Sequence, residues 1–554
     1  MCNITENIKS ASDRRVTAKA IQFQIFVRLL LSQTANGPGR PPARDTQSRC
    51  QPRTGVPKTE TEKLPAYTCT DAKLFLFHFY SPSRRAVRVK ILLLKEAIVL
   101  GNRISAEIHQ FKASMYKYPA HVDIDFSSFA ADNPEPETRY GLPQDIEFCT
   151  RCVISNQRPN STVEFKHTKQ SRKATIALDE EGVCDACRVA EEKHTTIDWG
   201  GREEELIALC DQHRSKDGSY DCLVPGSGGK DSFYAAHILK TKYGMHPLTV
   251  TWAPHIHTDW GWKNFESWIH AGFDNYLCTP NGRVHRLLTR LSVENLYHPF
   301  QPFVLGQKNL APKLAERFNI PLVFYGENEA EYGNPKTDVV TPIRSNTYYA
   351  AKDFDNIYLG GVSLTELQED FGLEEQDFIP YMPADPDRLE KVGIEVHYLG
   401  YYLKWHPQSA YYYSVEHGGF QASPERTPGT YSKYNSIDDK IDDLHYFCTH
   451  VKFGIGRATY DAAQEIRSKD ILREEGVALA KRFDGEYPDR FEADNFAYMS
   501  ITEDQFPIAA KNFENQKMTR DYFLHLADRF RSPHLWQRSE NGEWSLRRTV
   551  WQQN

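Results

Sequence analysis

A glycine-rich turn at residues 224–232, Val-Pro-Gly-Ser-Gly-Gly-Lys-Asp-Ser, constrains the fold of this chain more than any other stretch. The short apolar run at residues 220–224 is typical of a buried parallel strand, and residues 233–243 have the period of an amphipathic helix. Glycines let backbone N–H groups approach an anion closely, and a helix N-terminus adds unpaired donors and a favourable dipole. The turn therefore predicts a phosphate-binding loop between a strand and a helix of an α/β domain.

This loop differs from the Walker loop, because the spacing Gly-x4-Gly-Lys-Ser/Thr is missing. Its order from Ser227 to Ser232, Ser-Gly-Gly-Lys-Asp-Ser, resembles the PP-loop of ATP pyrophosphatases. Those enzymes split ATP into AMP and pyrophosphate while they activate a carbonyl oxygen. The alternative, a glycine-containing loop without a ligand, leaves the match of consecutive residues in a strand-to-helix context unexplained.

The charge of the chain changes sharply near residue 114. Residues 1–114 carry 19 Lys or Arg against 8 Asp or Glu, whereas residues 115–554 carry 48 against 66. We expect the basic segment to be a poorly ordered extension or sequence upstream of the true start, with Met115 as the natural initiator. The alternative is that Cys2 is the nucleophile of an N-terminal-nucleophile glutaminase, but no glutaminase pattern accompanies it.

The acidic body argues against a large nucleic-acid footprint, which needs a basic face to neutralise phosphates. The 11 cysteines are too few and too unevenly placed for a disulfide scaffold, so a reducing compartment fits best. No apolar run reaches the roughly 18 residues of a transmembrane helix. We therefore expect a cytoplasmic protein that binds neither membrane nor nucleic acid.

Two Cys-x-x-Cys units, Cys149 with Cys152 and Cys184 with Cys187, offer the four thiolates of a tetrahedral zinc site. No open coordination position is implied, so the pattern predicts a closed structural zinc that holds a small ribbon against the helical segment 203–214. The spacing between the pairs is long, and residues 162–179 must loop out. Four unconnected buried thiols are the alternative.

Further α/β alternation follows the loop. Residues 248–252 and 321–325 read as strands, and helices are predicted at 263–270, 284–296 and 312–318. An acidic turn, Gly-Glu-Asn-Glu-Ala-Glu-Tyr-Gly, follows the second of these strands at residues 326–333. Ligands of parallel sheets bind beyond the carboxyl ends of the strands, so this turn is placed to hold Mg²⁺ or a substrate amide. A solvated acidic turn is the alternative.

The C-terminal third is rich in aromatic residues, at 401–405, 411–413 and 426–434. Aromatic rings stack on sugars or bases while Arg and Lys bind carboxylate or phosphate, although packing alone explains many such rings. A second glycine-rich turn at residues 452–457 precedes predicted helices at 461–469 and 471–483. Arg457 beside that turn is a candidate anion contact.

From Cys149 onward the order of landmarks resembles one family, the N-acetyl sugar amidotransferases of bacterial surface-glycan and nonulosonic-acid biosynthesis. This family belongs to the PP-loop superfamily and includes enzymes of the lipopolysaccharide O-antigen and pseudaminic acid type. Besides the cysteine pairs and the loop at 227–232, the matching motifs lie at residues 252–255, 261–265, 298–303, 325–328, 331–333, 399–402, 429–433, 452–457 and 532–536. The first 114 residues have no counterpart in the family, and the segment between the cysteine pairs is long.

The resemblance implies a HUP-type, doubly wound parallel sheet with an N-terminal zinc ribbon and a mostly helical C-terminal region. The corresponding domains are an extension at 1–114, the ribbon at 115–200, the ATP-binding domain at 201–400 and a substrate-binding region at 401–554. It also implies a reaction, in which ATP and ammonia convert the acetamido group of an N-acetylated sugar acid or nucleotide sugar into an acetamidino group. The cofactors implied are ATP, Mg²⁺ and a structural Zn²⁺.

Roles for the site residues follow from the same resemblance. Backbone donors at Gly228 and Gly229, with Lys230, are expected to hold the pyrophosphate. Ser227 and Ser232 offer hydroxyl contacts, and Asp231 binds Mg²⁺ or caps the helix. The remaining residues expected in the site are Thr251 and Trp252 near the adenosine, and Glu327, Asn328 and Glu329 near the metal or the sugar.

No glutaminase signature accompanies these motifs, so the family implies that ammonia comes from a separate glutaminase and a cyclase-like subunit, similar to the pair of histidine biosynthesis. The nearest rival is a PP-loop tRNA-modifying enzyme of the tRNA thiolation or lysidine synthase type, which needs RNA contacts that the acidic body does not favour. A non-enzymatic rival is a zinc-ribbon interaction module on an inactive nucleotide-binding fold. The intact loop at 227–232 weighs against it.

Overall fold

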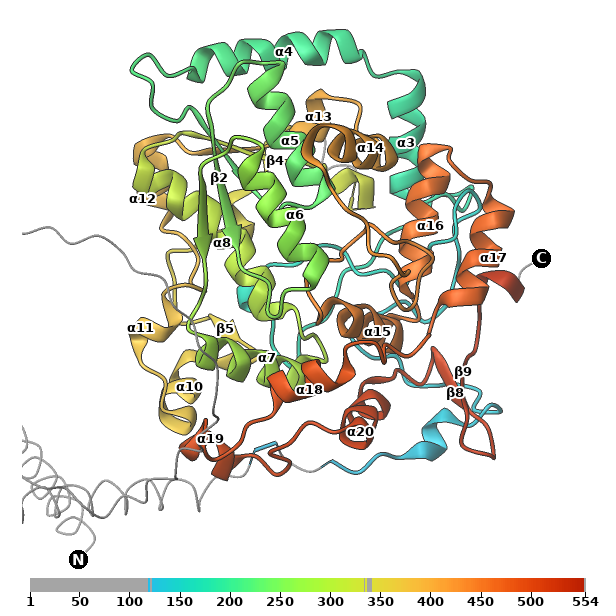
Figure 1. Ribbon diagram of the computed structural model, residues 1–554. Coiled ribbons are helices and arrows are strands. Elements are labelled where there is room, and N and C mark those ends of the chain that lie inside the picture. Colours follow the sequence, from blue (N-terminus) through green and yellow to red (C-terminus); the bar gives the residue numbers. More distant parts are fainter. Residues whose placement is uncertain (1–117, 120–121, 333, 336–340, 553–554) are drawn as a thin grey trace, which may run out of the picture. The chain divides into compact units, whose positions relative to one another are not determined.

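The computed structural model of the protein describes residues 118–119, 122–332, 334–335 and 341–552 (Figure 1). Contacts divide the chain into two units, Met1–Arg84 and Arg85–Asn554, and all that follows concerns the second. The basic segment 1–114, Cys2 and Met115 lie outside the described residues. No helix among the described residues combines the length and the apolar character that crossing a bilayer requires.

The centre of the fold is a parallel sheet of five strands in the order β3-β2-β1-β4-β7. The strands are β1 (Cys222–Pro225), β2 (Pro247–Trp252), β3 (Asn275–Cys278), β4 (Leu322–Tyr325) and β7 (Glu395–Tyr398). Neighbours pair in parallel register, for example Leu223 with Leu248 and Leu223 with Val323. The chain order reverses between β1 and β4, so this is the point where an open α/β sheet forms a ligand crevice. The predicted α/β class with a parallel sheet is confirmed.

Helices cover both faces of this sheet because its central strands are apolar on both sides. Cys222 and Val224 pack in one cluster with α4, α5 and α6, whereas Leu223 between them packs with α8 and α12. These helices are α4 (Trp199–His213), α5 (Lys230–Thr241), α6 (Asp259–His270), α8 (Gln301–Phe318) and α12 (Pro386–Val392). The alternation fixes the carboxyl end of β1, and therefore the glycine turn, between the two helical layers.

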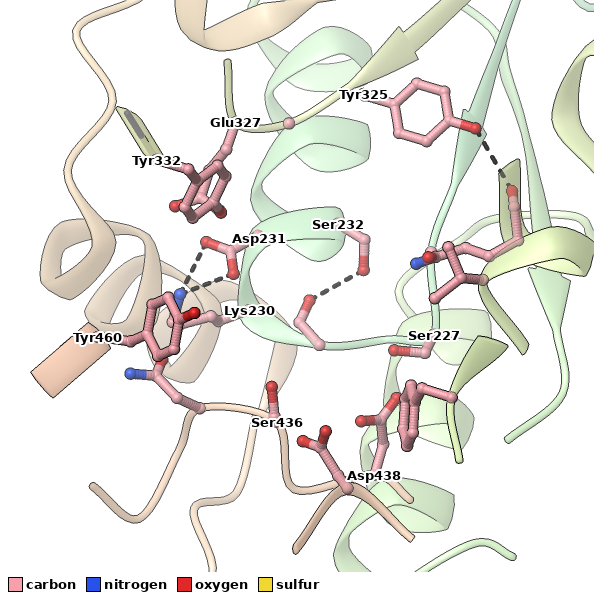
Figure 2. A pocket seen from close by; sticks show the side chains of 18 of the residues that line it. Ser227, Lys230, Asp231, Ser232, Tyr325, Glu327, Tyr332, Ser436, Asp438 and Tyr460 are labelled. Atoms are coloured by element: carbon pink, nitrogen blue, oxygen red, sulfur yellow. Dashed lines mark hydrogen bonds and ion pairs between the residues drawn. The ribbon is translucent and has the colours of Figure 1, made fainter. Parts of the chain in front are cut away.

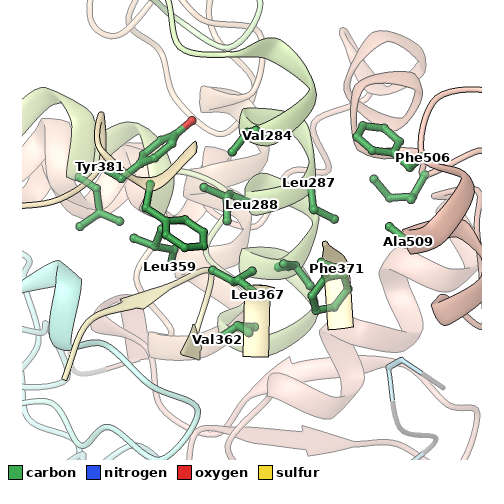
Figure 3. Packing of buried hydrophobic residues seen from close by; sticks show 14 of the residues in the cluster. Val284, Leu287, Leu288, Leu359, Val362, Leu367, Phe371, Tyr381, Phe506 and Ala509 are labelled. Carbon is green, nitrogen blue, oxygen red and sulfur yellow. The ribbon is translucent and has the colours of Figure 1, made fainter. Parts of the chain in front are cut away.

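A second apolar cluster joins the sheet domain to the C-terminal part of the described chain. Val284, Leu287 and Leu288 of α7 (Gly282–Leu296) pack against side chains that include Phe371 and Phe506 (Figure 3). The elements of the intervening chain are η3 (Glu329–Tyr332), η4 (Asn346–Tyr348), β5 (Tyr358–Leu359), β6 (Val362–Ser363), α10 (Leu364–Phe371), α11 (Glu375–Phe378), α13 (Leu399–Tyr402) and α14 (Pro407–Gly418). The C-terminal elements are α15 (Asp442–Phe453), α16 (Arg457–Ser468), α17 (Arg473–Phe483), α18 (Glu492–Met499), α19 (Pro507–Asn512), α20 (Arg520–Phe530), β8 (Trp536–Arg538), β9 (Trp544–Leu546) and η5 (Val550–Gln552).

The cysteine-bearing segment precedes the sheet and contains η1 (Phe126–Phe129), η2 (Glu164–Lys166) and α3 (Asp185–Thr195). Isolated bridges, Phe148 with Ser155 and Leu178 with Cys184, hold the two cysteine turns. Its buried side chains form one cluster with Ala462 and Ala463 of α16 and with residues of α17. The prediction that the ribbon lies against residues 203–214 is therefore wrong, because its apolar side is covered by the C-terminal helices instead.

Helix α8 shows where the sequence pattern misplaced a boundary. The α/β alternation of the sequence predicts a helix only over residues 312–318. The helix instead begins at Gln301 and carries Pro312 in its interior. Both Pro312 and Ala315 are buried there, which indicates that packing of α8 on the sheet outweighs the missing hydrogen bond.

Candidate functional site

A cavity of about 730 Å³ opens at the carboxyl ends of β1 and β4. Its lining includes the glycine turn after β1 and the acidic turn after β4, on opposite sides of the switch point. Figure 2 shows Lys230, Asp231 and Glu327 on one side of this cavity, and Ser227 with Asp438 on another. The sequence thus predicted both turns that form the floor of the site.

The glycine turn is held tightly against α6, and that packing requires glycine. Gly228 has φ +87°, and a Cβ built there would lie 2.8 Å from the backbone oxygen of Asn264. At Gly226 a Cβ would lie 2.1 Å from the Cβ of Ser232. Gly229 is the N-cap of α5, so the N–H groups of the first turn of α5 lack intrahelical acceptors and point toward the cavity side. The turn and helix together form an anion-binding geometry.

Lys230 begins α5 and its side chain is almost fully buried. Its Nζ donates to both carboxylate oxygens of Asp231, at 2.8 and 2.7 Å. Ser232 donates from Oγ to the backbone oxygen of Gly229 at 3.0 Å, which braces the turn. Ser227 contacts the carboxyl of Asp438, whose pKa burial raises. Four of the predicted loop side chains therefore line the cavity together.

Glu327 follows β4 and lies on the same side of the cavity as Lys230 and Asp231 (Figure 2). Burial, together with the nearby charge of Asp231, raises the pKa of Glu327 to about 8. A neutral amide reaches this carboxyl group, since Gln464 Nε2 donates to Oε1 at 2.9 Å. Two neighbouring carboxyl groups that repel each other in a buried site are suited to share a divalent cation.

The other two glutamates of the acidic turn, unlike Glu327, form ion pairs with basic side chains. Glu329 accepts from Arg344 Nη2 at 3.1 Å, and Glu331 accepts from Lys193 Nζ at 2.7 Å. Their side chains are only 16% and 12% exposed, so the alternative of a solvated acidic turn is wrong. Asn328 is buried and its backbone oxygen accepts from the N–H of Glu331, which shapes the turn. Glu329 lines the cavity, whereas Asn328 does not.

The two residues predicted near the adenosine lie at the end of β2. Trp252 lines the cavity, with its indole buried and its Nε1 without a partner among the described residues. Thr251 is fully buried, accepts a hydrogen bond from Asn275 Nδ2 at 3.0 Å and does not line the cavity. The pleat of β2 sends neighbouring side chains to opposite faces, so only one of the pair reaches the site.

The opposite wall comes from residues that the sequence analysis did not single out. Asp438, Asp439 and Asp442 precede or begin α15 and line the cavity, and Asp439 binds His255 Nδ1 at 2.7 Å. Burial raises the pKa of Asp442 well above its usual range. The repeated Ile-Asp-Asp at residues 437–443 was the available signal in the sequence. It is a weak signal, because acidic residues before a helix are also common helix caps.

Arg457, the candidate anion contact, lines the cavity at the start of α16. Its Nε donates to Asp461 Oδ2 at 3.2 Å, and its guanidinium lies 3.9 Å from the centre of the Tyr446 ring. Of the predicted aromatic groups, Tyr434 lines the cavity and stacks on Tyr411 at 4.3 Å between ring centres. Burial raises the pKa of Tyr434.

The four predicted metal ligands, Cys149, Cys152, Cys184 and Cys187, meet at one buried point. Their sulfurs lie within 4.8 Å of one another, and the pairs Cys149–Cys187 and Cys152–Cys184 are each 3.8 Å apart. Four sulfurs around a tetrahedral zinc at about 2.3 Å lie about 3.8 Å apart, so the group fits this ion. The alternative of unconnected thiols is wrong.

Comparison with known proteins gives one partial match. A family model described as "LPS biosynthesis protein WbpG-like, C-terminal domain" matches residues 428–550. Curated proteins give no match. The matched segment contains the aspartate run before α15 and all of α15 and α16, so it forms the wall of the cavity opposite the glycine turn. The match connects this chain with lipopolysaccharide biosynthesis.

Proposed function

We propose that this protein is an ATP-dependent amidotransferase that converts an acetamido group of an N-acetylated sugar into an acetamidino group. The observation that carries the proposal is one cavity that holds a glycine turn at a helix N-terminus and the carboxyl pair of Asp231 and Glu327. Its other wall belongs to the segment similar to a lipopolysaccharide biosynthesis domain. These features suit nucleotide chemistry on a glycan precursor.

The chemistry needs ATP because an amide carbonyl is a poor electrophile without an oxygen leaving group. Transfer of AMP to the amide oxygen releases pyrophosphate and creates a leaving group. Ammonia then adds to the carbon, and AMP departs with the former amide oxygen. The balanced result is an amidine, AMP and pyrophosphate from an amide, ATP and ammonia.

Residues that line the cavity, with Gly228 and Asn328 directly beside it in the chain, fit these requirements. Lys230 and the backbone N–H groups at Gly228 and Gly229 stabilise the negative charge that develops on the departing pyrophosphate. Asp231 and Glu327 are the residues that would hold Mg²⁺, which supplies charge neutralisation for the phosphates. Trp252 offers an indole donor and an aromatic face to the adenosine. Asn328 supports the turn that carries Glu327.

Zn²⁺ held by the four cysteines would be structural, since all four thiols are buried and leave no position for a substrate. Ammonia would come from a separate glutaminase with a cyclase-like subunit, similar to the pair of histidine biosynthesis. The rival function, tRNA modification, has no support from the matched family.

The test is to supply the purified protein with ATP, ammonium and a panel of N-acetylated sugar acids, both free and nucleotide-linked. We expect AMP and pyrophosphate in equal amounts, and a sugar product lighter by about one mass unit from exchange of O for NH. Release of ADP and phosphate would contradict the proposal. The panel also identifies the sugar, which the cavity alone does not choose.

A further inference from the structure

Helix α16 lies with one face along the cavity. Tyr460, Gln464 and Arg467 are spaced so that they share this face, and all three line the cavity. Gln464 reaches Glu327 at 2.9 Å, which brings this face to the end of the cavity where Lys230 and Asp231 lie. Arg467, one turn further along, lines the same cavity.

The guanidinium of Arg467 is positioned by one hydrogen bond and keeps an N–H donor without a partner among the described residues. Its Nη2 donates to the backbone oxygen of Glu331 at 2.9 Å, which ties α16 to the acidic turn. Its Nε is buried and has no partner among the described residues. A buried guanidinium N–H without an acceptor is costly, so the geometry favours an anionic ligand at this position.

Arg158 enters the same cavity from the ribbon, shortly after the first cysteine pair. Its backbone oxygen accepts from the N–H of Ile176 at 3.0 Å, and its guanidinium lies 5.7 Å from the ring centre of Tyr460. Its Nη1 is buried without a partner in the described part of the chain. Neither this arginine nor Arg467 forms an ion pair with a carboxylate there.

Two guanidinium groups that line one cavity with unpaired donors repel each other unless an anion lies between them. Arginine presents its N–H groups as a planar fork that matches phosphate oxygens in pairs. Lys230 and the N-terminus of α5 add positive charge to the same cavity. A single phosphate would need fewer donors than these groups provide together.

We propose that Arg158 and Arg467 form a diphosphate-binding subsite, so that the zinc ribbon contributes a ligand-binding residue and is not only a structural attachment. The proposal rests on the proposed function for the source of the diphosphate, which we expect to be ATP. A nucleotide-linked sugar carries the same group. The competing account is that both arginines only balance the charge of the nearby cysteine thiolates.

The test is isothermal titration calorimetry of the zinc-loaded full-length protein with pyrophosphate and, separately, with UDP. Arg158→Ala and Arg467→Ala are each expected to weaken pyrophosphate binding about 10- to 100-fold, the range for losing hydrogen bonds to a charged group. Arg473→Ala is the matched control, because Arg473 Nε contacts the backbone oxygen of Cys152 at 3.2 Å but does not line the cavity. Its pyrophosphate affinity should stay at the wild-type value.

Zinc content, measured on each variant, separates the two accounts. Reduced zinc with unchanged pyrophosphate and UDP affinity would overturn the proposal. If Arg158→Ala loses both zinc and pyrophosphate affinity, the variants Arg158→Lys and Arg467→Ala distinguish the two accounts. Lysine keeps the positive charge of Arg158 but lacks the planar guanidinium, so Arg158→Lys should bind pyrophosphate with intermediate affinity. Weaker binding of UDP alone would assign the subsite to a nucleotide-linked sugar.

These outcomes are independent of the proposed reaction. A wild-type protein that forms no AMP, with variants that bind pyrophosphate weakly, would refute the amidotransferase and keep the subsite. A wild-type protein that forms AMP, with variants that bind both diphosphates normally, would refute only the subsite.

Discussion

Replacing Glu327 by glutamine should stabilise the protein in mildly alkaline solution. Burial and the charge of Asp231 raise the pKa of Glu327 from 4.5 to about 8. Between pH 4.5 and pH 8 the carboxyl group of Glu327 keeps its proton in the folded protein but has lost it in the unfolded chain. Proton binding by this group therefore favours the folded state. This contribution is fully present below pH 4.5 and is lost as the pH rises toward 8.

The size of the effect follows from the shift. Each pKa unit corresponds to about 1.36 kcal/mol, so the full shift makes folding less favourable above pH 8 by at most about 5 kcal/mol. Glu327→Gln removes this dependence and still accepts the hydrogen bond from Gln464. The free energy of unfolding of the variant, relative to wild type, should therefore rise by up to about 1.4 kcal/mol per pH unit from pH 5 and level off above pH 8.

Urea unfolding of both proteins between pH 5 and pH 9, without nucleotide, measures this difference. Glu329→Gln is the matched control from the same turn, because Glu329 is paired with the buried Arg344. Breaking that pair should destabilise the protein, by about 3 kcal/mol. Parallel pH profiles for wild type and Glu327→Gln would refute the assignment of a buried, protonated Glu327.

Three further substitutions test other parts of the site. Lys230→Ala should lower AMP formation by about 100- to 1,000-fold and leave bound zinc unchanged, and normal turnover would remove Lys230 from the mechanism. Cys149→Ser should reduce zinc, measured by atomic absorption, from about one ion per chain to near zero, and an unchanged content would count against the four-cysteine site. Gly228→Ala should destabilise the protein by more than Gly218→Ala, because both glycines have positive φ but only Gly228 has backbone within 3 Å of a new Cβ. If urea unfolding showed that both variants lose about 1 kcal/mol of stability, the close packing of Gly228 against α6 would have no cost for a larger side chain.

The sequence predicted the parts of the fold that depend on local pattern. Strands β1, β2 and β4 are buried on both faces and therefore read as short apolar runs. Strand β3 was missed because it lies at the edge of the sheet, where Tyr276 and Leu277 are exposed, and because it begins with the polar Asn275. Strand β7 was missed because it contains Glu395 and His397, which bind each other at 3.0 Å.

In the candidate site, too, the sequence predicted local motifs but not the contacts between distant residues. The glycine turn, the acidic turn and the cysteine pairs are contiguous motifs, and the sequence predicted them. The contacts between them are not local. No sequence pattern near Glu327 predicts its hydrogen bond with Gln464, and none near His255 predicts its contact with Asp439. Such pairs depend on how the C-terminal helices dock, which is a property of tertiary packing.

That docking explains why the ribbon, the sheet and the C-terminal helices must be considered as one site. On α16, Ala462 and Ala463 pack into the apolar cluster around the cysteines, while the neighbouring Gln464 binds Glu327 in the cavity. A displacement of the ribbon would therefore move the partner of Glu327 through a single helix. Arg467 on the same helix contacts the turn that follows β4. Loss of the metal should thus weaken phosphate binding even though no cysteine is a substrate ligand, because the ribbon supports the helix that completes the cavity.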